Sequence, residues 1–185
     1  MRKPRPRRRI ALATTAVAAL LLGAAMIKLT GTADAFAATP KSTAINYLGS
    51  ITGTSVVSGQ HNKEPAGAPL QYSQIAHNIT GQWPGLWGGD MMFNPADVAN
   101  RQSVINQAKA QWAAGSLVAL TWHACSPTVG NTCAFDGGVK TTISSTQFQD
   151  IVTGGTALNT TWRNRMAEVV PYLRQLKDAG VPVLW

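Results

Sequence analysis

The sequence predicts an α/β fold organised around a parallel sheet. Short apolar runs of β-type residues alternate with longer stretches of helical periodicity, in the order β-α-β-α-β-α-β. The clearest run, 117–122, is almost entirely apolar, as expected for a parallel strand that is covered on both faces. Consecutive parallel strands need crossover connections, which the intervening helices supply. This order fits both an open doubly wound sheet and a closed barrel.

Residues 1–38 are organised as an export signal. Six Lys/Arg residues precede Ile10, the stretch 10–27 is largely apolar, and small residues around Ala35 and Ala37 fit a cleavage site. We therefore expect a signal peptide at 1–38, a secreted product, and a folded domain at 39–185 with no membrane attachment after cleavage. An uncleaved membrane anchor is the alternative, because the apolar stretch is long enough to cross a bilayer.

The net charge of +8 belongs to this leader and does not describe a basic surface. From Thr39 onward, nine Lys/Arg residues face seven Asp/Glu residues, and no basic cluster is present. No Gly-x-Gly-x-x-Gly or phosphate-binding glycine loop follows a predicted strand. Binding to nucleic acids or nucleotides is therefore not expected, and neither is a cofactor.

Cys125 and Cys133 are the only cysteines. In the oxidising surroundings of an exported protein, they are expected to form a disulfide. Two buried thiols are the alternative. A metal site is not expected, because two thiols without a matching histidine pair leave zinc short of ligands.

The first half of the folded domain contains two predicted strands and a helix. The β-branched run 54–59 predicts the first strand and 84–90, which ends in glycines, predicts the second. A helix is expected at 69–78. Its inner face is expected to hold Leu70, Ile75 and Ala76.

The next helix is expected to begin at Asp97, which can cap it, and to end at Gly115. The third strand, 117–122, follows it. The apolar side chains at helical spacing before that strand are Val104, Ile105, Ala108 and Trp112.

After the cysteines, Ser144 and Ser145 are expected to start a short helix, and a long helix is expected at 161–179. Pro171 is expected to kink or divide the long helix. Residues 181–185 then resemble the start of a fourth strand. The expected inner face of the long helix is Trp162, Met166, Val169, Val170, Leu173 and Leu176.

Polar and aromatic residues collect where the predicted strands end. Since ligand-contacting residues project from the carboxyl ends of parallel strands, these positions are candidates for one site. They are His61, Trp87, Asp90, Trp122 and His123. Aromatic rings cover the apolar faces of pyranoses while His and Asp bind hydroxyls, so the mixture is typical of a sugar site. The alternative is that these side chains belong to the core.

Several segments occur in an order that resembles glycoside hydrolase family 26, whose best-known members are endo-β-1,4-mannanases. The resemblance covers essentially all of 39–185 and corresponds to the front half of that family's catalytic domain. The segments are Val57-Ser58-Gly59-Gln60-His61, Pro84-Gly85-Leu86-Trp87-Gly88-Gly89-Asp90, Leu120-Thr121-Trp122-His123 with Pro127, Gly154-Gly155-Thr156-Ala157-Leu158 before Trp162, and Gly180-Val181-Pro182-Val183-Leu184-Trp185.

This resemblance implies a (β/α)₈ barrel of the TIM type, of which about four strands would be present. It also implies a retaining double displacement on β-mannan or a related plant polysaccharide, by an enzyme that is monomeric at full length. Trp122 and His123 would contact the sugar next to the cleaved bond. Asp90 would support them, and His61 would lie at the rim of the first strand.

The resemblance also implies that the catalytic carboxyls are not within this chain. Retaining hydrolysis needs two of them about 5–5.5 Å apart. The family places its acid/base Glu just after the fourth strand and its nucleophile later, both beyond Trp185, so this chain alone is expected to be inactive. The alternatives are a β-1,3-xylanase or mixed-linkage glucanase of the same family, a non-catalytic carbohydrate-binding protein, and an unrelated extracellular α/β module.

Overall fold

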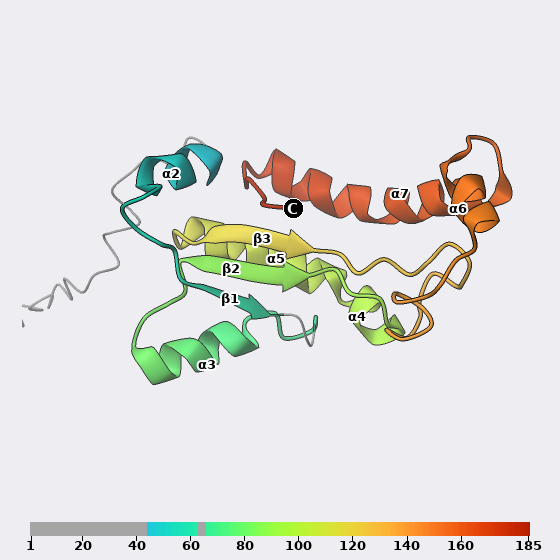
Figure 1. Cartoon of the computed structure of the whole chain (residues 1–185). Helices are drawn as coiled ribbons and strands as arrows, with labels where there is room; N and C mark the ends of the chain where they lie inside the picture. Colours follow the sequence, from blue (N-terminus) through green and yellow to red (C-terminus); the bar gives the residue numbers. More distant parts are fainter. Residues whose placement is uncertain (1–43, 63–65) are drawn as a thin grey trace, which may run out of the picture. The chain divides into compact units, whose positions relative to one another are not determined.

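Three parallel strands lie side by side in the order in which they occur in the sequence (Figure 1). They are β1 (Gly59–Asn62), β2 (Leu86–Asp90) and β3 (Leu117–Thr121). The computed structural model describes residues 44–62 and 66–185, all within one compact unit, Thr32–Trp185. The predicted signal peptide at 1–38 lies outside the described residues. The predicted α/β class with a parallel sheet is confirmed.

The carboxyl end of the chain continues this order. Leu184 forms an isolated parallel bridge with Ala119 of β3. Its N–H donates to the Val118 carbonyl at 2.9 Å, and its carbonyl accepts from the Leu120 N–H at 2.9 Å. The predicted fourth strand thus begins beside the third. An order without reversal is typical of a barrel, whereas a doubly wound sheet reverses its strand order at a switch point.

The first strand begins later than the sequence predicts. Residues 54–57 of the β-branched run do not pair, and Val56 is exposed. The Ser58 carbonyl accepts from the Leu86 N–H at 3.0 Å. The amides of Thr54 and Ser55 both donate to the Ile51 carbonyl, at 3.1 and 3.0 Å, and close the end of α2 (Ala44–Ile51). Those two N–H groups are therefore not available to a neighbouring strand, and the paired register begins at Gly59, opposite Leu86.

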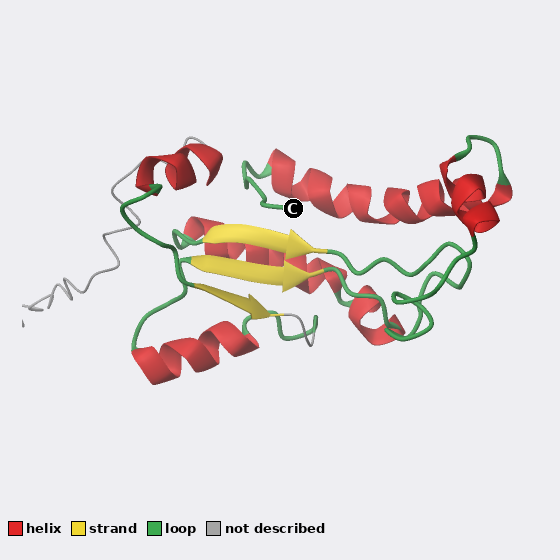
Figure 2. Ribbon diagram, viewed as in Figure 1, coloured by secondary structure: helices red, strands yellow, loops and turns green. Residues whose placement is uncertain are grey.

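Helices cover the sheet, as Figure 2 shows. Helix α3 (Gln71–Thr80) contacts β1, and its inner face differs from the prediction. Ser73 is its buried residue, and Ile75 is exposed. The reason is a polar contact: the Asn62 side chain donates to Ser73 Oγ at 2.9 Å and accepts from the Ser73 N–H at 2.9 Å. This pair turns the helix so that Ser73 faces β1.

The helix that was expected to start at Asp97 is two helices, α4 (Pro95–Ala99) and α5 (Arg101–Ala113). Asn94 caps α4, because its side chain accepts from the Asp97 N–H at 2.9 Å. The predicted capping role of Asp97 is therefore wrong. Its buried carboxylate instead accepts from the Ala66 N–H at 2.9 Å, a residue 31 positions away.

The last two helices are α6 (Ser145–Val152) and α7 (Ala157–Asp178). Ser144 forms a capping box with Gln147, as the serine pair predicts. Thr156 caps α7, so that helix begins four residues earlier than expected. Pro171 lies inside α7 on an exposed face and does not divide the helix. Met166 and Val170 are exposed and Arg165 is buried, contrary to the expected inner face.

The core lies between the sheet and helices α5 and α7, which also contact each other. Its largest buried side chains include Trp87, Met91, Ile105, Val118 and Leu176. Within the ranges that the structure describes, no helix has the length and apolar character needed to cross a membrane.

Candidate functional site

Strand alternation separates the predicted site residues into two groups. His61 pairs with Gly88, and Asp90 pairs with Thr121, so these four residues share one face of the sheet. His123 follows two positions after Thr121 and joins this face. Trp87 and Trp122 have the opposite parity and point toward the helices.

Asp90 is the centre of the first group. Its side chain is 0% exposed, and its Oδ2 lies 2.7 Å from His123 Nδ1 and 3.8 Å from His61 Nε2. Its other oxygen, Oδ1, accepts from the Met92 N–H at 2.8 Å. Because a carboxylate only accepts hydrogen bonds, the short contact favours a proton on Nδ1 of His123 and leaves Nε2 for other partners.

The two histidines keep access to solvent while Asp90 does not. The side chains of His61 and His123 are 44% and 37% exposed. His61 lies across Gly88, where a Cβ atom would stand 2.8 Å from its Nδ1. Glycine at position 88 therefore makes room for the His61 ring. The structure thus brings together three predicted residues, His61, Asp90 and His123, as an open rim over a buried carboxylate.

The two tryptophans lie elsewhere. Trp87 is 0% exposed and its indole N–H donates to the Pro69 carbonyl at 2.9 Å, so this residue belongs to the core. A rim position for Trp87 is therefore wrong. Trp122 stacks on Trp162 of α7, with ring centroids 6.0 Å apart and an angle of 6° between the planes. It is half-buried against the core and does not join the His61–Asp90–His123 group.

Two phenylalanines that sequence reasoning missed surround His123. The His123 ring makes edge contacts with Phe93 and Phe135, at centroid distances of 6.2 and 5.9 Å. Phe135 is partly exposed, and the Lys140 ammonium lies 5.3 Å from its ring centre. Both phenylalanines occur in irregular loops, where hydrophobic periodicity carries no signal. They supply the aromatic surface that was expected from Trp87 and Trp122.

The sequence matches the family model described as glycosyl hydrolase family 26 over residues 33–185. The chain belongs to this family. No curated protein matches it. The predicted family and the predicted (β/α)₈ barrel fold are both confirmed. The described residues hold three strands and the start of a fourth.

Solved structures resemble this family 26 chain over about three quarters of its length. The structure of GH26A from Muricauda sp. MAR_2010_75 is 29% identical, with a TM-score of 0.70, and the match covers 76% of this chain and 44% of that one. A β-mannanase from a symbiotic protist of the termite Reticulitermes speratus, complexed with gluco-manno-oligosaccharide, is 22% identical, with a TM-score of 0.61 and coverage of 75% and 45%.

Bacillus subtilis mannanase Man26 is also 22% identical, with a TM-score of 0.58 and coverage of 72% of this chain and 40% of that one. The likeness to the two mannanases shows the fold alone. The family 26 chain spans between 40% and 45% of the length of these three structures.

A disulfide and a buried arginine organise the loop that follows β3 in this family 26 chain. Cys125 and Cys133 are bonded to each other, as predicted. The Arg165 guanidinium donates to the carbonyls of Cys125, Ser126 and Val129 and to the side chain of Asn131. Burial lowers the pKa of Arg165, and Glu168 partly opposes this. We call residues 125–133 the cysteine loop.

Removal of the disulfide is expected to destabilise the fold. The crosslink closes a loop between residues eight positions apart, so the double variant Cys125→Ser/Cys133→Ser should lose about 2–3 kcal/mol of unfolding free energy. Urea unfolding of this variant and of the parent, each with and without reductant, measures the difference. An unchanged midpoint in the variant would contradict the expectation, and reductant should affect only the parent.

The described residues provide one carboxylate at a strand end, that of Asp90. The other described acidic side chains lie in α4, the loop after the cysteines, α6 and α7, at positions 97, 136, 150, 168 and 178. None is at the carboxyl end of a strand. No group of three or more His, Cys, Asp or Glu side chains within the described ranges could hold a metal ion.

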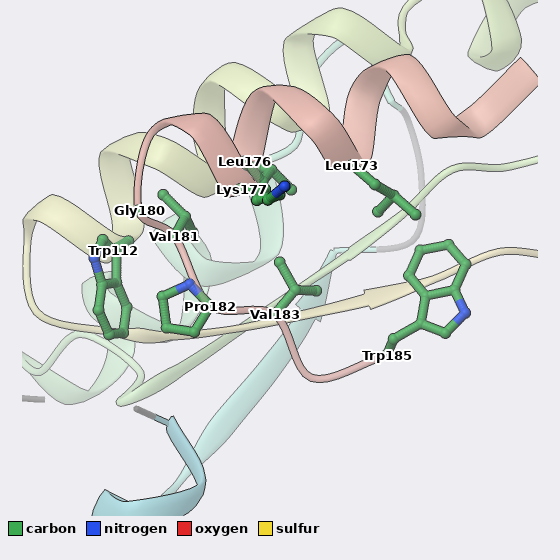
Figure 3. Close-up of a pocket in the computed structure, with 9 residues that line it drawn as sticks. All are labelled: Trp112, Leu173, Leu176, Lys177, Gly180, Val181, Pro182, Val183 and Trp185. Carbon is green, nitrogen blue, oxygen red and sulfur yellow. The ribbon is translucent and has the colours of Figure 1, made fainter. Parts of the chain in front are cut away.

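A separate pocket lies between the end of α7 and the segment 180–185 (Figure 3). Its lining is mostly apolar and includes Trp112, Leu176, Val183 and Trp185. None of the predicted site residues lines it. The rim around His123 is therefore the candidate site, and the pocket is a separate feature of the helix layer.

Proposed function

We propose that this chain contributes the sugar-binding rim of a secreted enzyme that hydrolyses β-1,4-mannan by a retaining double displacement. The observation that carries the proposal is the buried Asp90 carboxylate, 2.7 Å from the Nδ1 of a partly exposed His123 at the carboxyl ends of β2 and β3. Membership in glycosyl hydrolase family 26 gives the reaction class. The similarity to structures described as mannanases supports the choice of mannan.

The geometry suits recognition of a pyranose. Asp90 holds the His123 ring in one orientation, so Nε2 can bond a sugar hydroxyl without first losing rotational freedom. His61 offers a second polar group on the same face. The partly exposed Phe135 ring, in contact with His123, can cover an apolar sugar face. Together these groups supply the polar and aromatic contacts that a sugar site requires.

The chemical step needs two carboxyls about 5–5.5 Å apart. Asp90 is fully buried and already bonded to Met92 and His123, so it does not serve as either of them. We propose that the acid/base and the nucleophile come from residues beyond Trp185, and that residues 1–185 alone bind sugar without cleaving it.

Secretion is part of the same proposal. The basic, apolar and small-residue segments of 1–38 are arranged as in an export signal. A disulfide between Cys125 and Cys133 suits an oxidising compartment. Expression of the chain in a secreting host, with N-terminal sequencing of the product, tests cleavage after Ala37 or Ala38.

Affinity electrophoresis in gels that contain galactomannan tests sugar binding. The parent chain should be retarded. His123→Ala should weaken binding about tenfold, because it removes a hydrogen bond to the sugar and leaves the side chains around position 123 free to move. His77→Ala is the matched control, since His77 stacks on Trp83 away from the rim. Parallel gels with β-1,3-xylan and mixed-linkage glucan compare the other polysaccharides. If His123→Ala is retarded as strongly as the parent, the rim around His123 is not the sugar-binding site.

A further inference from the structure

The backbone turn that carries Asp90 is held by a buried arginine on the next helix. The Arg101 guanidinium donates from Nε to the Met91 carbonyl at 2.5 Å and from a terminal nitrogen to the Met92 carbonyl at 2.9 Å. Arg101 is buried at the start of α5. It reaches the two residues that directly follow Asp90, and both of these are fully buried as well.

This turn has a backbone conformation that requires support. Met92 has φ of +52°, in the left-handed region that side chains other than glycine rarely adopt. In this conformation the Met92 N–H donates to Asp90 Oδ1. That bond fixes the carboxylate so that its other oxygen faces His123. The two carbonyl contacts of Arg101 therefore act on the orientation of Asp90 through the backbone and not by direct contact.

A glutamate on α7 extends this support to the cysteine loop. Glu168 Oε2 lies 4.0 Å from a terminal nitrogen of Arg101, and Glu168 Oε1 accepts from the Asn131 side chain at 2.7 Å. Asn131 also accepts from Arg165 at 3.2 Å. The turn after β2 and the loop that begins just after His123 are thus linked to the same helix through buried or half-buried charged groups.

We propose that Arg101 is a positioning residue, which sets the Asp90–His123 contact by holding the turn at Met91 and Met92 and, through Glu168, the cysteine loop. Burial lowers the pKa of Arg101, while Glu168, Tyr172 and Asp90 oppose this shift. An arginine remains charged at neutral pH even when buried. The planar guanidinium of Arg101 therefore donates to the carbonyls of both Met91 and Met92. Only the effect on sugar affinity rests on the proposed function.

The test compares Arg101→Met and Arg101→Lys with the matched control Arg163→Met, an exposed arginine on α7. Three quantities are measured in the whole 185-residue chain: the melting temperature, the imidazole ¹H and ¹⁵N resonances, and the affinity for mannohexaose. The sequence has only three histidines, so single substitutions assign their resonances. In the parent, His123 should show a slowly exchanging Nδ1–H signal, because Asp90 accepts from it.

Arg101→Met should remove the slowly exchanging His123 signal and weaken mannohexaose binding about tenfold, as misplaced supporting residues do. Arg101→Lys keeps the positive charge but loses the planar guanidinium with its two donors. This variant should retain the slowly exchanging His123 signal and bind mannohexaose with an intermediate affinity. Arg163→Met should match the parent in all three measurements. The proposal is overturned if Arg101→Met only lowers the melting temperature, with an unchanged His123 signal, or if the parent lacks that signal.

The NMR result separates this proposal from the proposed function. If the parent shows the His123 signal but does not bind mannohexaose, the sugar-binding function fails, while the response of the signal to Arg101→Met still decides the role of Arg101.

Discussion

Replacement of Trp87 by alanine is expected to lower the free energy of unfolding by about 3–5 kcal/mol. The indole is 0% exposed in the core beneath the sheet, and its N–H donates to the Pro69 carbonyl. The substitution removes a large apolar side chain, leaves a cavity beside Val104 and Val118, and leaves that carbonyl without its partner. Chemical denaturation followed by circular dichroism measures the loss.

Trp83→Ala is the matched control for this experiment. Trp83 is 46% exposed and stacks only on His77 among the ring contacts of the described residues, so its loss should cost less than about 1.5 kcal/mol. Equal effects of the two substitutions would contradict a core position for Trp87. If Trp87→Ala keeps the parental stability but binds sugar less well, Trp87 belongs to the sugar-binding rim and not to the core.

His123→Ala is expected to cost about 3 kcal/mol of stability, because it leaves the buried Asp90 carboxylate without its closest partner. Adding Asp90→Asn should recover part of this loss. The amide is neutral, and its oxygen can still accept from the Met92 N–H. The double variant should therefore be more stable than His123→Ala alone. Thermal or urea unfolding of the two variants gives the comparison directly.

His61→Ala provides the control in this set. His61 lies 3.8 Å from Asp90 Oδ2 and is more exposed than His123, so its removal should cost less than the loss of His123. If the double variant is less stable than His123→Ala, the cost does not come from an unpaired carboxylate. In that case packing of His123 against Phe93 and Phe135 is the larger contribution.

The face on which each strand-end residue lies could have been predicted more fully from alternation alone. Asp90 and Trp87 are three positions apart in one strand and therefore point to opposite faces. Gly88 and Asp90 share the face of His61, whereas Trp87 shares the face of Val118. Sequence reasoning grouped the residues by their nearness to a strand end and ignored this parity. That is why it placed Trp87 and Trp122 in the site, although both lie on the face that packs against the helices.

Other features could not be predicted, because their partners are distant in the sequence. Nothing near Asp97 indicates that its carboxylate accepts from the Ala66 N–H, so its place before the apolar helical pattern suggested a cap. Arg165 has the spacing of a solvated helix position, yet it is buried, and it donates to carbonyls of the cysteine loop 36 to 40 residues earlier. Such bonds are decided by how α7 packs against that loop.

The sequence by itself determined the order of the strands, the family, the disulfide pair and three of the residues that meet at the rim. These follow from local periodicity, from segments with characteristic residues, and from the presence of only two cysteines. Only the tertiary structure decided that Asp90 is buried between two histidines, that Phe93 and Phe135 flank His123, and that Arg101 holds the turn. Each of these depends on side chains from different elements that come within a few ångströms only after the sheet and helices have packed.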